Sequence, residues 1–189
     1  LIKAQKYDGN IYDKNGKPIE GAYADLNHDG VINSSDLYRY HSRTPDWILG
    51  FSTSFNYKKW TLGASFRAEL GNYLYNGMAM NTGAFGTVSY NAYQLNNMSR
   101  SYLKTGFNSR QYLSDYYVEN ASFLKMDNLS LSYDFGKISK WCSLHASAMV
   151  QNVFTITKYS GVDPEVYDGI DMSFYPRPRT YSLSLGFDF

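Results

Sequence analysis

Apolar and polar residues alternate one by one in several segments of the chain. In the first segment Leu49 and Phe51 stand on one side, whereas Gly50 and Ser52 stand on the other. Successive side chains of a β-strand point to opposite faces, so this period of two predicts strands with one apolar and one polar face. The five alternating segments are residues 47–57, 60–70, 123–135, 142–151 and 180–189. The expected fold class is therefore all-β.

The third segment contains a break in its alternation. Leu124 and Met126 stand in the opposite phase to Leu129 and Leu131. One extra residue in a strand shifts the phase by one position, and this is what a β-bulge does. We therefore expect a bulge near Asp127.

Short and long connections alternate along the chain. Residues 58–59 and 136–141 are short, whereas residues 1–46, 71–122 and 153–179 are long. In an up-and-down antiparallel sheet this order places every short turn at one end, as in outer-membrane barrels with periplasmic turns and long extracellular loops. The segments have about 9 to 13 residues, close to the roughly 9–11 that cross a bilayer at a tilt. A soluble β-protein with one solvated face is the alternative.

The number of strands bears on the kind of barrel. Five strands cannot close one, because the smallest bacterial barrels have about eight. We therefore expect about five strands of a large antiparallel transmembrane β-barrel, with the other strands outside this sequence. The chain begins at Leu1 without an initiator Met or a signal segment, which also favours a piece of a longer protein.

The composition agrees with this interpretation and excludes other classes. Aromatic residues make up 17% of the chain, and 19 of them are Tyr. Charged residues make up 19%, against about 25% in an ordinary domain. A net charge of +1 gives no electrostatic reason to expect a nucleic-acid partner. Cys142 is the one cysteine, so no internal disulfide is possible. No apolar run approaches the roughly 18 residues of a membrane-spanning helix.

The first long segment contains a pattern of oxygen ligands typical of a Ca²⁺ loop. Loop positions 1, 3, 5, 7, 9 and 12 are Asp25, Asn27, Asp29, Val31 (through its carbonyl), Asn33 (through water) and Asp36. Gly30 stands at position 6, where such loops turn sharply. Asp36 replaces the usual Glu and no amphipathic helix precedes the loop, so a lone dockerin-like loop is expected. An Asx-rich turn without metal is the alternative.

Other polar and aromatic residues suggest weaker sites. The acidic stretch 163–171 is expected to be a solvated extracellular loop rather than a second metal site. Arg67 and Glu69 are expected to form an ion pair that faces the lumen. Tyr-rich segments at 73–75, 90–93 and 112–117 suit packing or an aromatic girdle better than contact with sugar rings.

Catalysis has little support in the sequence. His28, His41 and His145 are scattered, and no nucleophile elbow, phosphate loop or zinc motif accompanies them. His145 is expected to face the lumen. We therefore expect that the chain is not an enzyme.

A series of short motifs, in one order along the chain, carries a family resemblance. They are residues 24–33, 57–60, 117–129, 151–155, 158–165, 175–176 and 179–181, followed by the final Phe189. With these motifs the chain resembles the C-terminal part of the SusC/RagA-like TonB-dependent outer-membrane transporters of Bacteroidetes. The resemblance extends over nearly the whole chain.

The resemblance implies a function and partners that the residues alone do not. Members of this family have a barrel of about 22 strands with an N-terminal plug, and TonB transmits inner-membrane energy to them. A SusD-like surface lipoprotein usually covers the barrel and captures a glycan or peptide. The resemblance thus implies TonB-dependent import of oligosaccharides across the outer membrane of a Gram-negative bacterium. Expected partners are the SusD-like lipoprotein, the remaining barrel and plug, TonB, a glycan and outer-membrane lipid.

The last strand ends in a pattern that suits barrel assembly. Its alternate positions are all large and apolar: Tyr181, Leu183, Leu185, Phe187 and Phe189. An alternating edge strand of this kind can be captured by strand addition, so we expect it to be the assembly signal. The alternatives to an oligosaccharide importer are a peptide importer of the same family, a Ca²⁺-binding dockerin-like surface module, and a passive porin or adhesin barrel.

Overall fold

The computed structural model describes residues 2–4, 13–15, 18–88, 97–172 and 175–189. The chain divides into two compact units. We call residues 46–70, 122–158 and 177–189 the sheet unit, and residues 1–45, 71–121 and 159–176 the loop unit. Residues 1–45 of the segment 1–46, predicted as a part of its own, are thus assigned to one unit with most of the other two long connections.

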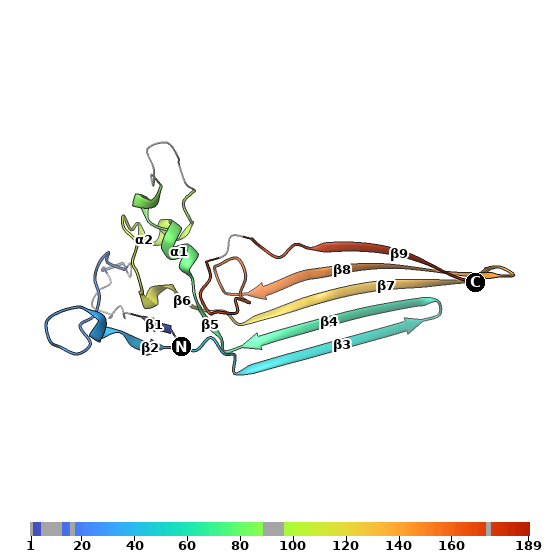
Figure 1. Cartoon of the computed structure of the whole chain (residues 1–189), viewed down its shortest axis with the longest axis horizontal. Helices are drawn as coiled ribbons and strands as arrows, with labels where there is room; N and C mark the ends of the chain where they lie inside the picture. The colour runs from blue at the N-terminus through green and yellow to red at the C-terminus, as the bar shows by residue number, and fades with distance from the viewer. Residues whose placement is uncertain (1, 5–12, 16–17, 89–96, 173–174) are drawn as a thin grey trace. The chain divides into compact units, whose positions relative to one another are not determined.

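The sheet unit is a five-stranded antiparallel sheet in which sequence neighbours are spatial neighbours (Figure 1). The strands are β3 (Trp47–Tyr57), β4 (Trp60–Leu70), β7 (Phe123–Ser139), β8 (Cys142–Thr157) and β9 (Thr180–Asp188). The two short turns, at 58–59 and 140–141, lie at the same end of the sheet, as the alternation of connections predicts.

Strand ends follow the prediction closely for β3 and β4 and less closely for β7 and β8. The alternation stops at 135 and 151, but β7 runs on to Ser139 and β8 to Thr157. The predicted turn 136–141 is therefore wrong, and the turn has two residues. The pairing of β7 with β8 continues through register irregularities, one of them beside Gly136, whose φ is 75°. Apolar and polar side chains do not alternate regularly there, so the sequence pattern does not indicate a strand.

The bulge predicted near Asp127 is confirmed. Met126 pairs with Phe66 of β4 and Asn128 pairs with Ser65, so Asp127 has no partner on that strand. The extra residue restores the phase, and Met126 and Leu129 lie on the same face of the sheet.

Cross-strand pairing gathers like residues on each face of the sheet. One apolar row runs from Phe51 through Phe66 and Met126 to Phe154. The neighbouring row on the other face is polar and consists of Ser52, Ser65, Asn128, Gln151 and Thr180. The apolar face is open: Phe55 is 63% exposed and Leu183 78%. Among the described residues, β3 and β9 each have one edge without a partner strand.

The loop unit has secondary structure and a core of its own. Its strands pair as β1 (Ile2–Ala4) with β2 (Tyr38–Tyr40) and β5 (Tyr73–Tyr75) with β6 (Val118–Asn120). Its helices and 3₁₀ turns are η2 (Ser34–Asp36), α1 (Gly77–Thr82), η3 (Phe85–Thr87), α2 (Ser101–Thr105) and η4 (Asp115–Tyr117). Two clusters of buried side chains hold it: Tyr75, Ala79, Met80 and Tyr117 in one, and Leu74, Ala121 and Tyr159 in the other. The predicted loops are therefore folded segments.

In the described part of the chain, no helix has the length and apolar character needed to span a membrane.

Candidate functional site: the polar face of the sheet and the loop unit

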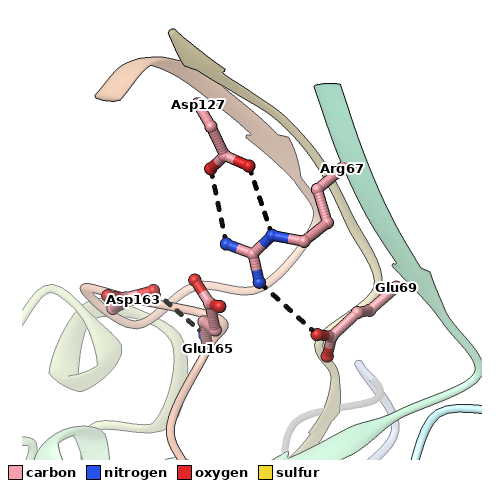
Figure 2. A network of polar contacts seen from close by, with 5 residues as sticks. All are labelled: Arg67, Glu69, Asp127, Asp163 and Glu165. Carbon is pink, nitrogen blue, oxygen red and sulfur yellow. Dashed lines mark hydrogen bonds and ion pairs between the residues drawn. The ribbon is translucent and has the colours of Figure 1, made fainter. Parts of the chain in front are cut away.

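A charged cluster lies on the polar face of the sheet, where the bulge interrupts β7 (Figure 2). The Arg67 guanidinium contacts both carboxylate oxygens of Asp127, with Nε–Oδ2 3.3 Å and Nη2–Oδ1 3.4 Å. Its Nη1 lies 3.7 Å from Oε1 of Glu69. The predicted Arg67–Glu69 ion pair is thus confirmed, and Asp127 is a member that the prediction missed.

The bulge explains why Asp127 belongs to this cluster. A residue added to a strand has no partner on the neighbouring strand, and the direction of its side chain changes. The break in alternation at this residue was therefore the available signal for the missing partner. The cluster holds two carboxylates for one guanidinium, which stays charged at any pH that proteins meet. Its side chains remain partly exposed, 31% for Arg67 and 38% for Asp127, so they can also bind other polar groups.

His145 lies on the polar face of β8, as predicted. Its Nδ1 is 3.6 Å from Oδ2 of Asp188, and both side chains are well exposed. Gly186 pairs with His145 across β8 and β9, and a Cβ at Gly186 would overlap the imidazole ring. Because Gly186 has no side chain, the imidazole ring of His145 can occupy this position. Of the other histidines, His28 is exposed in the 25–36 loop and His41 stacks on Tyr73 with centroids 3.7 Å apart.

The 25–36 loop is closed around the side chain of Asp36. This side chain is fully buried; Oδ1 accepts from the Leu26 N–H at 2.9 Å and Oδ2 from the Asn33 N–H at 2.7 Å. The hydrogen bond from the Asn33 N–H is the largest effect on the carboxyl, and it holds the pKa of Asp36 below its usual value. The Asn33 side chain in turn accepts from the Ser35 N–H, and Asn33 and Asp36 together form a capping box on η2.

The other oxygen ligands predicted for Ca²⁺ also accept backbone hydrogen bonds. Asp25 accepts from the Gly30 N–H at 2.8 Å and Asp29 accepts from the Val31 N–H at 2.8 Å. Gly30 has φ 81°, as the sharp turn at position 6 requires. Asn27 donates from Nδ2 to Asp29 at 2.9 Å. Among the described residues, no three His, Cys, Asp or Glu side chains converge on one point. The loop therefore has the turn geometry of a Ca²⁺ loop, closed by its own hydrogen bonds.

The acidic stretch 163–171 is solvated only in part. Asp168 accepts from the Ile170 N–H at 3.2 Å, and Asp163 accepts from the Glu165 N–H at 3.0 Å (Figure 2). Asp171, however, is fully buried and accepts from the Tyr159 hydroxyl at 2.8 Å. Burial, then this hydrogen bond, raises the pKa of Tyr159 far above its usual value. The prediction of a solvated stretch is wrong at Asp171, which stabilises the fold of the loop unit.

Most of the described tyrosines in the Tyr-rich segments are packing residues. Tyr75 and Tyr117 are buried, with ring centroids 6.2 Å apart in an edge-on arrangement. Segment 90–93 lies outside the described residues. Tyr112 differs from the others because it is 56% exposed. Among the described tyrosines of these segments, it is therefore the best placed to meet a ligand.

Comparison with known proteins now bears on this sheet and its loops. No family model matches the chain. The sequence is 39% identical over 188 residues to the TonB-dependent receptor SusC of Bacteroides thetaiotaomicron, covering 95% of this chain and 18% of that receptor. It is 26% identical over 189 residues to the TonB-dependent receptor P3 of Formosa agariphila, covering 88% of this chain and 19% of that receptor. The resemblance to SusC/RagA-like TonB-dependent transporters is confirmed.

The fold agrees with that of SusC/RagA-like transporters. The structure of the RagAB peptide transporter superposes with a TM-score of 0.75 at 24% identity, over 99% of this chain and 22% of that chain. The RagAB peptide importer in its closed-closed state gives a TM-score of 0.71 at 22% identity. The prediction of antiparallel strands from a TonB-dependent transporter barrel is confirmed.

These SusC/RagA-like relatives also bear on location and chemistry. They are outer-membrane transporters of Gram-negative Bacteroidetes, and the predicted outer-membrane location is confirmed. They are named as receptors and transporters rather than enzymes, in agreement with the expectation from the sequence. The chain spans about a fifth of the length of the relatives it matches.

Proposed function

We propose that this chain forms part of the wall and the extracellular loops of a transporter that imports oligosaccharides across the outer membrane with energy from TonB. The observation that carries the proposal is the 39% identity to SusC along 95% of the chain. The sheet unit supports it, because its apolar face suits lipid and its polar face suits a wet lumen.

The remaining partners follow from the same proposal. The loop unit faces the outside of the cell and meets a SusD-like lipoprotein, while the rest of the barrel pairs with the free edges of β3 and β9. The plug and TonB act through the part of the protein outside this sequence. The alternate apolar residues of the last strand, Tyr181 to Phe189, present the assembly signal, and Phe189 is 98% exposed.

Oligosaccharide is the substrate class that the exposed rings of the loop unit favour. Tyr112, for example, is 56% exposed. Such rings offer an apolar face with a polar rim, which suits the C–H face of a sugar. Peptide is the second candidate, because the similar RagAB structures are those of a peptide transporter.

A cellular uptake assay tests the proposed function. Deleting the gene that contains this segment should abolish accumulation of a labelled oligosaccharide, and the complete gene should restore it. Disrupting TonB should give the same loss, because the inner membrane supplies the energy. Labelled peptides serve as the comparison. Loss of peptide uptake with unchanged oligosaccharide uptake would contradict the substrate class, and unchanged uptake of both would contradict import.

We also propose that the 25–36 loop binds Ca²⁺. Spacing and the turn at Gly30 support this proposal, and Asp25, Asn27, Asp29, Val31, Asn33 and Asp36 would supply the oxygens. Extracellular Ca²⁺-binding loops have dissociation constants for Ca²⁺ of about 10⁻⁴–10⁻³ M. A chelator should therefore make the loop protease-sensitive, with protection returning near about 1 mM Ca²⁺.

Two variants make the Ca²⁺ experiment specific. The double variant Asp25→Asn/Asp29→Asn removes two charges and should be protease-sensitive with or without Ca²⁺. Asp168→Asn, which changes an acidic turn residue elsewhere in the loop unit, should behave like the wild type. If chelation leaves the wild-type loop equally protected, its backbone hydrogen bonds suffice and the metal proposal is wrong.

A further inference from the structure

The loop unit contains a cleft whose residues none of the sites described above uses. Its volume is about 360 Å³, within the roughly 300–1,000 Å³ of small-molecule sites. The lining residues are Gly86, Thr87, Asn108, Ser109, Arg110 and Tyr112. A single sugar ring fits a cleft of this size, and the lining combines polar groups with one aromatic ring.

Hydrogen bonds hold the two walls of the cleft in place. The Gly86 N–H donates to the Asn108 carbonyl at 2.8 Å, and a Cβ at Gly86 would lie only 2.8 Å from the same oxygen. On the other side, Glu20 accepts from the N–H groups of Asn108 at 2.8 Å and Ser109 at 2.7 Å. The cleft is therefore preformed, which reduces the ordering cost of binding.

Glu20 also sets the charge beside the cleft. Burial raises the pKa of Glu20, but the hydrogen bonds from Asn108 and Ser109 together outweigh burial and leave the pKa below its usual value. The carboxylate is thus ionised at neutral pH, and its negative charge lies beside Asn108 and Ser109 of the lining. A neutral ligand suits this site better than an anion does, because Glu20 would repel an anion.

Two side chains keep polar groups available for a ligand. Arg110 donates from Nε to the Asn81 carbonyl and from Nη1 to the Tyr112 hydroxyl, both at 3.3 Å. A guanidinium has five N–H donors, so these two bonds leave others for a ligand. The side-chain amide of Asn108 makes no hydrogen bond within the described part of the chain, and it can both donate and accept. Sugar hydroxyls need both kinds of partner.

The ring of Tyr112 forms the apolar wall. Its hydroxyl accepts from Arg110, and its backbone carbonyl accepts from the Tyr23 hydroxyl at 3.2 Å. One hydrogen bond thus holds the ring at its hydroxyl and another holds the backbone of the residue, which is still 56% exposed. A fixed aromatic face next to hydrogen-bonding groups is what stacking on a sugar ring requires.

We propose that this cleft binds one ring of a neutral oligosaccharide, with Tyr112 stacked on the ring and Arg110 and Asn108 hydrogen-bonded to its hydroxyls. The inference rests on the proposed function, because it assigns a contact for the oligosaccharide that the transporter imports. It adds a residue-level site within the loop unit.

Binding to the complete transporter tests the site. An array of neutral and uronic-acid oligosaccharides is probed with the purified transporter, and the strongest neutral glycan is then titrated by calorimetry. Tyr112→Ala should weaken its binding about tenfold and Asn108→Ala several-fold, because a ring contact and a hydrogen bond are lost. Tyr112→Phe keeps the ring and should bind within about twofold of the wild type. Tyr167→Ala, which removes an exposed tyrosine elsewhere, should bind like the wild type.

The outcomes separate this site from the proposed function. Unaltered binding by Tyr112→Ala, an equal loss in Tyr167→Ala, or an array that retains only acidic glycans would each overturn the site. If wild-type cells still accumulate oligosaccharide in those cases, the proposed function stands without the cleft. If they accumulate none, the proposed function fails as well. Equal protease resistance of all variants excludes misfolding as the cause of a loss.

Discussion

Refolded in detergent without the rest of the transporter, the 189-residue chain should aggregate rather than give a monomeric β-species. Among the described residues, β3 and β9 each have one unpaired edge, and every residue of β3 is exposed. Each backbone N–H or C=O left unpaired in hydrocarbon costs several kcal/mol, so a membrane-spanning sheet has to close on itself. Free edges pair instead with other copies of the chain.

Size-exclusion chromatography and gel electrophoresis with and without heating measure this outcome. The complete transporter, refolded in the same detergent, is the control and should give a monomer whose gel mobility changes on heating. A monomeric species of the 189-residue chain with protected strand amides would contradict the proposed role of the sheet as part of a barrel.

The substitution Leu131→Arg should remove most of the complete transporter from the outer membrane, whereas Ser132→Arg should leave its level nearly unchanged. The two residues are neighbours on β7, but Leu131 pairs with Leu62 and Ala148 on the apolar face. Ser132 pairs with Thr61 and Ser147 on the polar face. An Arg on the lipid face of a barrel costs about 2–4 kcal/mol near the bilayer midplane, whereas the lumen hydrates it.

Membrane fractionation with an antibody measures both variants against total synthesis. Because the two substitutions introduce the same side chain one residue apart, strand propensity and charge are matched. Equal membrane levels of the two proteins would show that the apolar face does not meet lipid, and a greater loss for Ser132→Arg would reverse the assignment of the faces.

The sheet could be predicted from the sequence because its alternation is imposed residue by residue. Every second side chain of β3 and β4 has the same environment, so a local pattern suffices to locate both strands. The end of β7 escaped prediction because pairing continues past Gly136 without alternating side chains. The end of β8 escaped prediction because its pairing with β7 continues past another register shift, near Asn152 at φ 54°. Pairing of this kind depends on the neighbouring strand rather than on local sequence.

The loop unit could not be predicted in the same way because its contacts are remote in sequence. Tyr75 and Tyr117 pack together, and Tyr159 reaches the core through Leu74 and Ala121. Such contacts produce no repeating pattern of apolar and polar residues in the local sequence. The buried Asp171 shows the same limit: an acidic residue in a polar stretch looks solvated until the Tyr159 hydroxyl is found beside it.

The bulge at Asp127 has a consequence for how this strand can change during evolution. The number of residues in a strand decides which face each side chain points to, and the extra residue keeps Met126 and Leu129 on the same face. Replacement of Asp127 by another residue leaves these faces unchanged and alters only the contact with Arg67. Deletion of Asp127 would turn Leu124 and Met126 to the polar face, and Phe123 and Lys125 to the apolar face. This position should therefore accept other side chains in related proteins while the residue itself is never lost.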